Sequence, residues 1–209
     1  MRPNTPISWS YSKDDAWNFS EDAFNFVNAK YFPLVDSESF NSTLVEEFFE
    51  KSYPKFSKDL KAVFSCDQTN CKEGFARWIQ ASHWYCNTRW AFRKALLKDN
   101  IGPIYPTQFN EPNCDPVDGK NTKSCHCSEG AYVRGQRFSA FGQRMKSTFA
   151  KFYKTGSMDL KTFSEMNFDA FNILSASTWT QSPVLDWTEC QILDKIHENA
   201  DNRGYTFGY

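Results

Sequence analysis

The segment CHCSEG places His126 between Cys125 and Cys127 and three residues before Glu129. An imidazole can serve as a general base or bind a metal ion, and a neighbouring carboxylate can orient its ring. Zinc bound by the two cysteines and Cys114 is one interpretation, but ligands at alternating positions do not match the two-residue spacing that is usual in zinc sites. A catalytic base and a loop histidine without a chemical role are the other two interpretations.

The composition excludes several classes of function. The 209 residues carry 24 basic and 25 acidic side chains, a balance that does not indicate binding to nucleic acid or to an anionic membrane surface. No apolar run approaches the roughly 20 residues that a membrane-spanning helix needs. We therefore expect no nucleic-acid partner and no membrane span.

Cysteines and glycosylation sequons indicate an extracellular protein. Seven cysteines without paired Cys-x-x-Cys spacing are typical of disulfides plus one spare thiol, and Asn18 and Asn41 each begin an acceptor sequon. The sequence starts without the apolar core of a signal peptide. We expect a secreted protein whose beginning is missing from this chain. The sequence alone leaves open the pairing of Cys66, Cys71, Cys114, Cys125 and Cys127.

Two strands are predicted among the elements that must position these side chains. Apolar residues alternate over 6–12, as in a strand with one buried face. Residues 102–110 also have the pattern of a strand, although Pro106 indicates an edge strand or a bulge. Residues 111–135 have the composition of a loop.

Helical spacing of apolar residues predicts four helices, at 41–53, 72–98, 137–156 and 188–199. The third has an apolar stripe that starts at Phe138, and Gly156 is suited to its end. No linker divides the chain, so we expect a single partial domain over residues 1–209.

Two segments carry a resemblance that favours one interpretation of His126. In CHCSEGAYVRG, His126 is followed by Glu129 and then by an aromatic residue, Val and Gly. This pattern resembles the catalytic-histidine loop of type-B carboxylesterases, the cholinesterase-like branch of the α/β-hydrolases. PISWSYSKDDAWNF is similar to the strand and turn that present the family's catalytic acid, and Asp15 falls on the position of that acid. Asp stands there in place of the commoner Glu, and Ala16 replaces a Gly.

Two more segments extend the resemblance. Cys86 in HWYCNTRWAF and Cys190 in TECQILDKI look like the two halves of the family's C-terminal disulfide. FGQRMKSTFAKFYKTGSMD resembles the helix that precedes the family's final strands. The four matches follow the family's order along the chain. The resemblance therefore implies an α/β fold: the C-terminal part of an α/β-hydrolase, rich in helices, with a few strands of an incomplete central sheet.

The resemblance also implies the chemistry of a serine esterase. In this fold Ser, Asp/Glu and His follow one another along the chain in that order. His126 would be the general base, and Asp15 would orient it. Glu21 and Asp22, in a partial duplicate of the acidic segment, are alternatives to Asp15. Glu129 is either a carboxylate that supports the same network or a surface acid.

The nucleophile of this chemistry is absent from the sequence, which contains no Gly-x-Ser-x-Gly and no His-Gly-Gly-Gly. The resemblance places both motifs before residue 1. We therefore expect a fragment of a carboxylic-ester hydrolase that is inactive alone, and poorly soluble because a sheet edge and aromatic faces would be uncovered. Once completed, its site would take a small-molecule or lipid ester without a metal or organic cofactor. A non-catalytic cholinesterase-like adhesion module and a small disulfide-rich structural protein are the alternatives.

Overall fold

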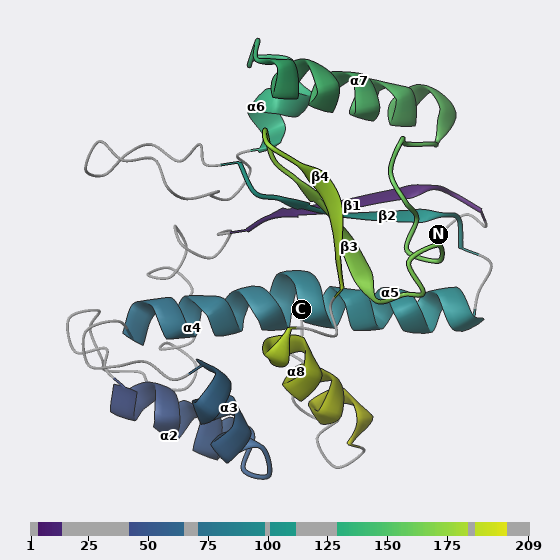
Figure 1. The fold of residues 1–209 in the computed structure, drawn as a ribbon. Coiled ribbons are helices and arrows are strands. Elements are labelled where there is room, and N and C mark those ends of the chain that lie inside the picture. The colour runs from purple at the N-terminus through teal and green to yellow at the C-terminus, as the bar shows by residue number, and fades with distance from the viewer. Residues whose placement is uncertain are drawn as a thin grey trace. The chain divides into compact units, whose positions relative to one another are not determined.

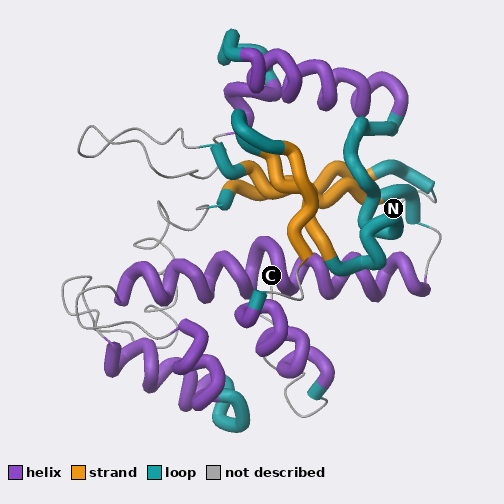
Figure 2. The backbone as a smooth tube through the Cα atoms, viewed as in Figure 1, coloured by secondary structure: helices purple, strands orange, loops and turns teal. Residues whose placement is uncertain are grey.

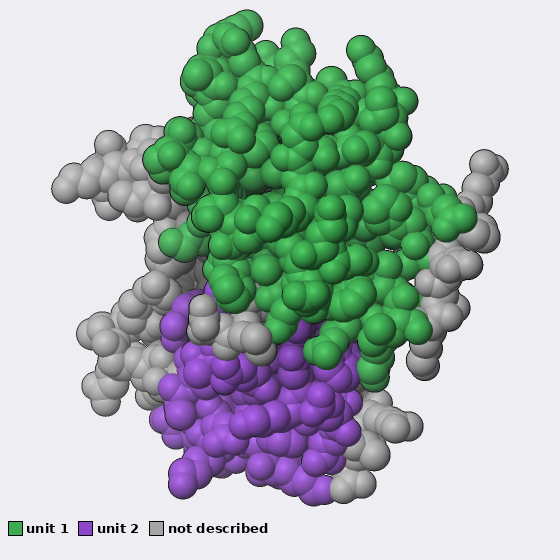
Figure 3. Space-filling model, turned by 45° about the vertical axis from the view of Figure 1, so that its right-hand side comes forward, with its two compact units in different colours: residues 1–15, 91–186 green, residues 16–90, 187–209 purple. Residues whose placement is uncertain are grey.

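The computed structural model describes residues 4–13, 42–64, 71–98, 101–111, 129–183 and 187–199. The chain divides into two compact units (Figure 3). Residues 1–15 and 91–186 form unit 1, whereas residues 16–90 and 187–209 form unit 2. A single domain over the whole chain stays a prediction. Within the described ranges, no helix is long and apolar enough to cross a membrane.

Unit 1 is built on a four-stranded sheet with the order β1-β2-β3-β4 (Figures 1 and 2). The strands are β1 (Ile7–Ser12), β2 (Ile104–Phe109), β3 (Ala170–Leu174) and β4 (Trp179–Pro183). Strand β2 is parallel to β1 and to β3, and β4 runs antiparallel to β3. The sheet confirms the predicted α/β class with a few strands, and β1 and β2 are the two strands that the local pattern predicts.

Pro106 lies in a central strand, so the prediction that it marks an edge strand or a bulge is wrong. It is in register with Trp9 of β1, whereas the ladder to β3 begins only at Thr107. The Pro106 carbonyl accepts a hydrogen bond from the Asn172 side-chain amide of β3, with a distance of 3.0 Å between the atoms. The N–H and C=O of one strand residue point to the same side. A backbone N–H at position 106 would therefore point towards β3 before the β2–β3 ladder begins, so its absence in proline costs no hydrogen bond of that ladder.

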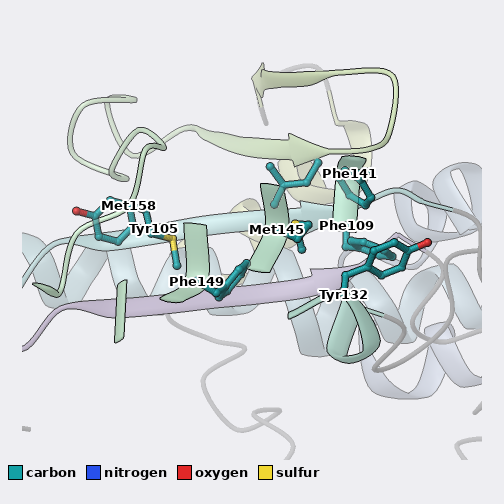
Figure 4. Close-up of a cluster of buried hydrophobic side chains, with 8 residues drawn as sticks. Tyr105, Phe109, Tyr132, Phe141, Met145, Phe149 and Met158 are labelled. Carbon is teal, nitrogen blue, oxygen red and sulfur yellow. The ribbon is translucent and has the colours of Figure 1, made fainter. Parts of the chain in front are cut away.

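One face of the sheet is covered by α6 (Glu129–Val133) and α7 (Ala140–Thr155), as Figure 1 shows. Figure 4 shows the side chains that pack between these helices and the strands. The buried members of this core are Tyr105, Phe109, Tyr132, Phe141, Met145, Phe149, Met158 and Leu174. Each large apolar side chain buried there contributes about 1.5–3 kcal/mol relative to exposure.

Local signals set the ends of α7. The Ser139 hydroxyl accepts a hydrogen bond from the Gly142 amide at 3.1 Å and so caps the N-terminus. Gly156 ends the helix with a φ of 71°, a left-handed conformation that favours glycine, and this confirms its predicted role. Phe138 precedes the cap and is 86% exposed, so its predicted place in the apolar stripe is wrong. The loop predicted over 111–135 is also wrong in part, because Glu129–Val133 is helical.

The opposite face of the sheet carries aromatic side chains. Trp9 and Tyr11 alternate with serines along β1, and their rings pack against Phe171 of β3 at centroid distances of 4.9 and 5.4 Å. Phe92 also packs on Trp9, at 5.2 Å. Phe92 belongs to α5 (Cys86–Lys98), whose residues from Ala91 onward lie in unit 1. Unit 1 therefore has helical cover on both faces of its sheet.

Unit 2 is helical in its described residues. Its elements are α2 (Ser42–Ser52), α3 (Ser57–Phe64), α4 (Cys71–Gln80), the π-helical turn η1 (Ala81–Tyr85), the first residues of α5, and α8 (Thr188–Glu198). Trp78 is fully buried among the rings of Phe48 and Phe75, at centroid distances of 4.8 and 5.4 Å. These helices confirm the predicted helices at 41–53 and 188–199. Together with the part of α5 in unit 1 they also confirm the one predicted at 72–98, whereas α3 is a helix that apolar spacing missed.

A disulfide between Cys86 and Cys190 joins α5 to α8 within unit 2, with 5.0 Å between the Cα atoms. Both residues are buried, and the bond is the one that the resemblance implied. One turn further on, the buried Arg89 guanidinium forms an ion pair with Asp194 of α8. A charge with so little exposure is stable only when it is paired. The same two helices are therefore fixed both covalently and by a buried charge pair.

Candidate functional site

The parallel strands of unit 1 end side by side. Ser12, Phe109 and Leu174 are the last residues of β1, β2 and β3, and they are in register with one another. We call these three residues, with those that directly follow each strand, the carboxyl edge. In open α/β sheets, ligand sites lie outside the carboxyl ends of the strands. The carboxyl edge is therefore the place in unit 1 where functional side chains are expected.

A hydrogen bond links the end of β1 to the start of α6. The Ser12 hydroxyl donates to the Glu129 carboxylate, with 3.1 Å between Oγ and Oε2. Ser12 is fully buried and Glu129 is half-buried, so water competes little for this interaction. A hydrogen bond to a charged group contributes about 1.5–3 kcal/mol. Two segments that are far apart in the sequence are thus held together at the carboxyl edge.

Glu111 forms a second link at the carboxyl edge, two residues after β2. Its carboxylate accepts a hydrogen bond from the Ala176 amide at 2.8 Å, in the turn that follows β3. Burial raises the pKa of the Tyr132 phenol, and the Glu111 carboxylate adds to this rise while Arg137 opposes it. Tyr132 therefore keeps its proton at neutral pH and presents a neutral hydroxyl near Glu111.

Most of the residues predicted to carry the chemistry lie outside the described residues. These are His126, Asp15, the alternatives Glu21 and Asp22, and the sequon residues Asn18 and Asn41. Of the cysteines whose pairing was open, Cys71 begins α4, whereas Cys66, Cys114, Cys125 and Cys127 lie outside the described residues as well. Their roles stay predictions.

Glu129 is the residue of the predicted catalytic network whose surroundings the structure describes. It is not a fully exposed acid, because it is half-buried and bound to Ser12. The Glu129 carboxylate can fix the backbone on either side of it, and a carboxylate of this kind can also orient an imidazole. Among the residues the structure describes, no three His, Cys, Asp or Glu side chains gather closely enough to hold a metal ion.

Reasoning from the sequence missed Ser12 and Glu111. Both stand at or just after the end of a predicted strand, so the carboxyl-edge rule could have selected them as positions. Their partners could not be found in this way, because the contacts of Ser12 with Glu129 and of Glu111 with Ala176 each join residues more than sixty positions apart.

A mixed sheet with helical cover on both faces defines unit 1 as an α/β structure, and the chain as a whole has a partial α/β-hydrolase fold. Two solved structures show this. One is named PNB esterase, with 15% identity and a TM-score of 0.57 over 90% of this chain and 38% of that chain. The other is Aspergillus niger EstA, with 12% identity and a TM-score of 0.58 over 92% of this chain and 40% of that one.

These likenesses concern the fold, since the identities are low. The chain spans about two fifths of the length of the two solved structures. No family model matches the sequence, and no curated protein matches it.

Proposed function

We propose that this chain carries the base and the acid of a Ser-Asp/Glu-His triad in a carboxylic-ester hydrolase. His126 is the general base, and Asp15 orients it and stabilises its charged form. The serine lies on a segment outside these 209 residues, and the C-terminal portion of the enzyme is what this chain supplies. The observation that carries the proposal is the hydrogen bond between Ser12 and Glu129.

That hydrogen bond brings together the two chain segments on which the proposed acid and base lie. Asp15 follows Ser12 by three residues, and His126 precedes Glu129 by three residues. Three residues of extended chain cover at most about 11 Å. The Ser12–Glu129 contact is therefore compatible with a hydrogen bond between Asp15 and His126, and it supports the proposed pairing.

The proposed triad carries out ester hydrolysis through an acyl-enzyme. The His126 imidazole takes the proton of the serine hydroxyl as this attacks the ester carbonyl, and returns it to the departing alcohol. Water repeats the cycle on the acyl-enzyme. The name of one similar structure, an esterase, supports a small-molecule or lipid ester as substrate. The buried disulfide fits the secretory pathway that the sequons suggest.

Ester turnover tests the proposal directly. The protein at its full natural length is expected to hydrolyse p-nitrophenyl butyrate, and to lose this activity as a fluorophosphonate labels one serine per active site. Mass spectrometry of the labelled peptide identifies that serine. Absence of both turnover and labelling would contradict the proposal and would favour a non-catalytic binding module.

Removing the Ser12 hydroxyl should impair catalysis more than binding. We expect Ser12→Ala to lower kcat by about 10–100-fold with KM little changed, because a shift of about 1 Å in the acid or the base is enough for such a loss. The matched control is Ser10→Ala, the same change two residues earlier on the same face of β1. Glu129→Gln keeps an acceptor oxygen and should lose less than Glu129→Ala. Equal kinetics for the Ser12 and Ser10 variants would show that the contact does not position the reacting groups.

A further inference from the structure

A cavity of about 240 Å³ opens in unit 1, lined by residues of α7 and β4. Strand β4 is the last strand in the sheet order (Figure 1). It is lined by one residue of α7, by the segment that follows this helix, and by the first residues of β4. We call it the α7–β4 pocket, and its lining residues are Arg144, Met158, Asp159, Leu160, Lys161, Trp179, Thr180 and Gln181. None of them belongs to the carboxyl edge or to the proposed triad.

The pocket combines an apolar part with a polar part. Met158 is buried, and Leu160 and Trp179 are half-buried where they pack against the core of unit 1. Arg144, Lys161 and the β4 residue Thr180 are exposed, so their polar groups lie where solvent or a ligand can reach them. Ligand sites typically join an apolar wall to a few polar groups that fix orientation.

The charge of the polar part is positive. Two cations, Arg144 and Lys161, contribute to it. The one lining acid, Asp159, forms an ion pair with Lys151 of α7, which adds a further positive charge beside it. Lys161 also has the Glu165 carboxylate near it, whose pKa is lowered mainly by hydrogen bonds from Thr162 and, to a smaller extent, by the Lys161 charge.

The Glu165 carboxylate accepts its hydrogen bonds from Thr162 and not from the Lys161 ammonium. The Thr162 amide and hydroxyl donate to the same Glu165 oxygen, at 2.7 and 2.8 Å, and hold that carboxylate against the backbone. Both acids near the pocket are thus engaged by groups other than Arg144. The field in the pocket attracts an anion rather than a cation.

The Arg144 guanidinium lies over the Trp179 ring. Its guanidinium carbon lies 3.9 Å from the centroid of the Trp179 ring, which is the geometry of a cation–π contact. A guanidinium that stacks through its face keeps its N–H groups in the plane, where they can bind a carboxylate with two parallel hydrogen bonds. Within the described part of the chain, no side-chain acceptor is bound to this guanidinium, so the donors can serve a ligand.

The size of the cavity limits the ligand. It is smaller than the roughly 300–1,000 Å³ of sites for drug-sized molecules. It holds at least about eight water molecules at ~30 Å³ each. We propose that the α7–β4 pocket binds a small organic carboxylate, with the carboxylate on Arg144 and Lys161 and an apolar body against Trp179 and Met158.

Benzoate is the probe that tests this proposal, because one ring and one carboxylate match the two parts of the pocket. Titration of the ¹⁵N-labelled protein at its full natural length with benzoate is expected to shift the amide signals of Leu160, Thr180 and Gln181 with one Kd below about 1 mM. Benzamide has the same shape without the charge and should bind at least about tenfold more weakly. Inorganic phosphate has charge without the apolar body and should also bind more weakly.

Variants assign the binding to the pocket. Arg144→Gln should weaken benzoate binding by about tenfold or more, whereas Lys154→Gln, an exposed cation near the end of the same helix, should leave it unchanged. His126→Gln should also bind benzoate normally, so a failure of this proposal is distinct from a failure of the triad. Binding that does not saturate, equal affinity for phosphate, or equal losses in the Arg144 and Lys154 variants would each overturn the assignment.

Discussion

Replacing His126 by glutamine is expected to lower kcat for ester hydrolysis by about 10⁴-fold or more in the protein at its full natural length. Glutamine is similar in size but cannot take a proton from the nucleophile at neutral pH, so the serine loses its base. A 10⁴-fold loss corresponds to roughly 5.5 kcal/mol of transition-state stabilisation. KM should change far less, because the imidazole acts on the proton and not on the bound ester. Steady-state kinetics with p-nitrophenyl butyrate measure both quantities.

Asp15→Asn should lower kcat by on the order of 10⁴-fold, since the wrong tautomer of His126 is then favoured. The double variant gives the sharper test. Members of a triad act as a unit, so the loss in the double variant should be no larger than the loss in the His126 variant alone. Multiplicative losses would mean that the two side chains act independently, and would contradict the pairing.

The matched controls are Glu21→Gln and Asp22→Asn, which remove charges from the neighbouring copy of the acidic segment. Each should keep kcat within about tenfold of the parent, because in this proposal neither acid orients His126. A large loss in either control, together with a small loss in Asp15→Asn, would transfer the role of the acid to that residue. Thermal melting of every variant separates loss of chemistry from loss of fold.

The parts of the fold that the sequence predicts are those with local causes. Gly156 ends α7 because it can adopt a positive φ, and Met145 and Phe149 recur at helical spacing on its buried face. The Phe138 error has the same origin. Its spacing fits the stripe, but the Ser139 hydroxyl caps the helix one residue later and leaves Phe138 in solvent.

Strands β3 and β4 were out of reach of local reasoning. Every residue of Ala170–Leu174 is buried, so the segment shows no alternation, and a short apolar run is compatible with a helix or a strand. Trp179–Pro183 is a mostly polar edge strand, and only its pairing with β3 defines it. Pro106 was misjudged for a related reason, because whether its missing N–H matters depends on where the β3 ladder begins.

The candidate site also has one part that the sequence predicts and one part that only the fold shows. Glu129 could be selected as a candidate because it lies in a recognisable sequence pattern. Its bond to Ser12 depends on the register of β1 and β2, which is not encoded near residue 129. Reasoning from the sequence can thus name positions at the ends of strands, whereas the contacts between them require the assembled sheet.

Removing the disulfide is expected to destabilise the chain by about 3–4 kcal/mol. Cys86 and Cys190 are 104 residues apart, and the chain-entropy treatment of a loop of this size gives at most about 4.7 kcal/mol. The variant Cys86→Ala/Cys190→Ala also loses buried volume, since both side chains are nearly inaccessible. Arg89 and Asp194 still pair in this variant, so α8 keeps one link to α5 and complete unfolding is not expected. Denaturant titration measures the free energy of unfolding, and the melting temperature should fall by on the order of 10 °C.

Treatment with a reductant distinguishes the effect of this disulfide on stability from that of any disulfide formed by the five other cysteines. Dithiothreitol should lower the stability of the parent chain towards that of the double variant, because it breaks the same cross-link and relaxes the unfolded chain. The double variant should respond to dithiothreitol by much less than the parent does. If both respond equally, another disulfide dominates stability. A third outcome is that neither responds and the double variant is as stable as the parent. The cross-link between α5 and α8 then does not restrain the unfolded chain. In that case the buried Arg89–Asp194 ion pair and the aromatic core of unit 2 must hold α8 in place.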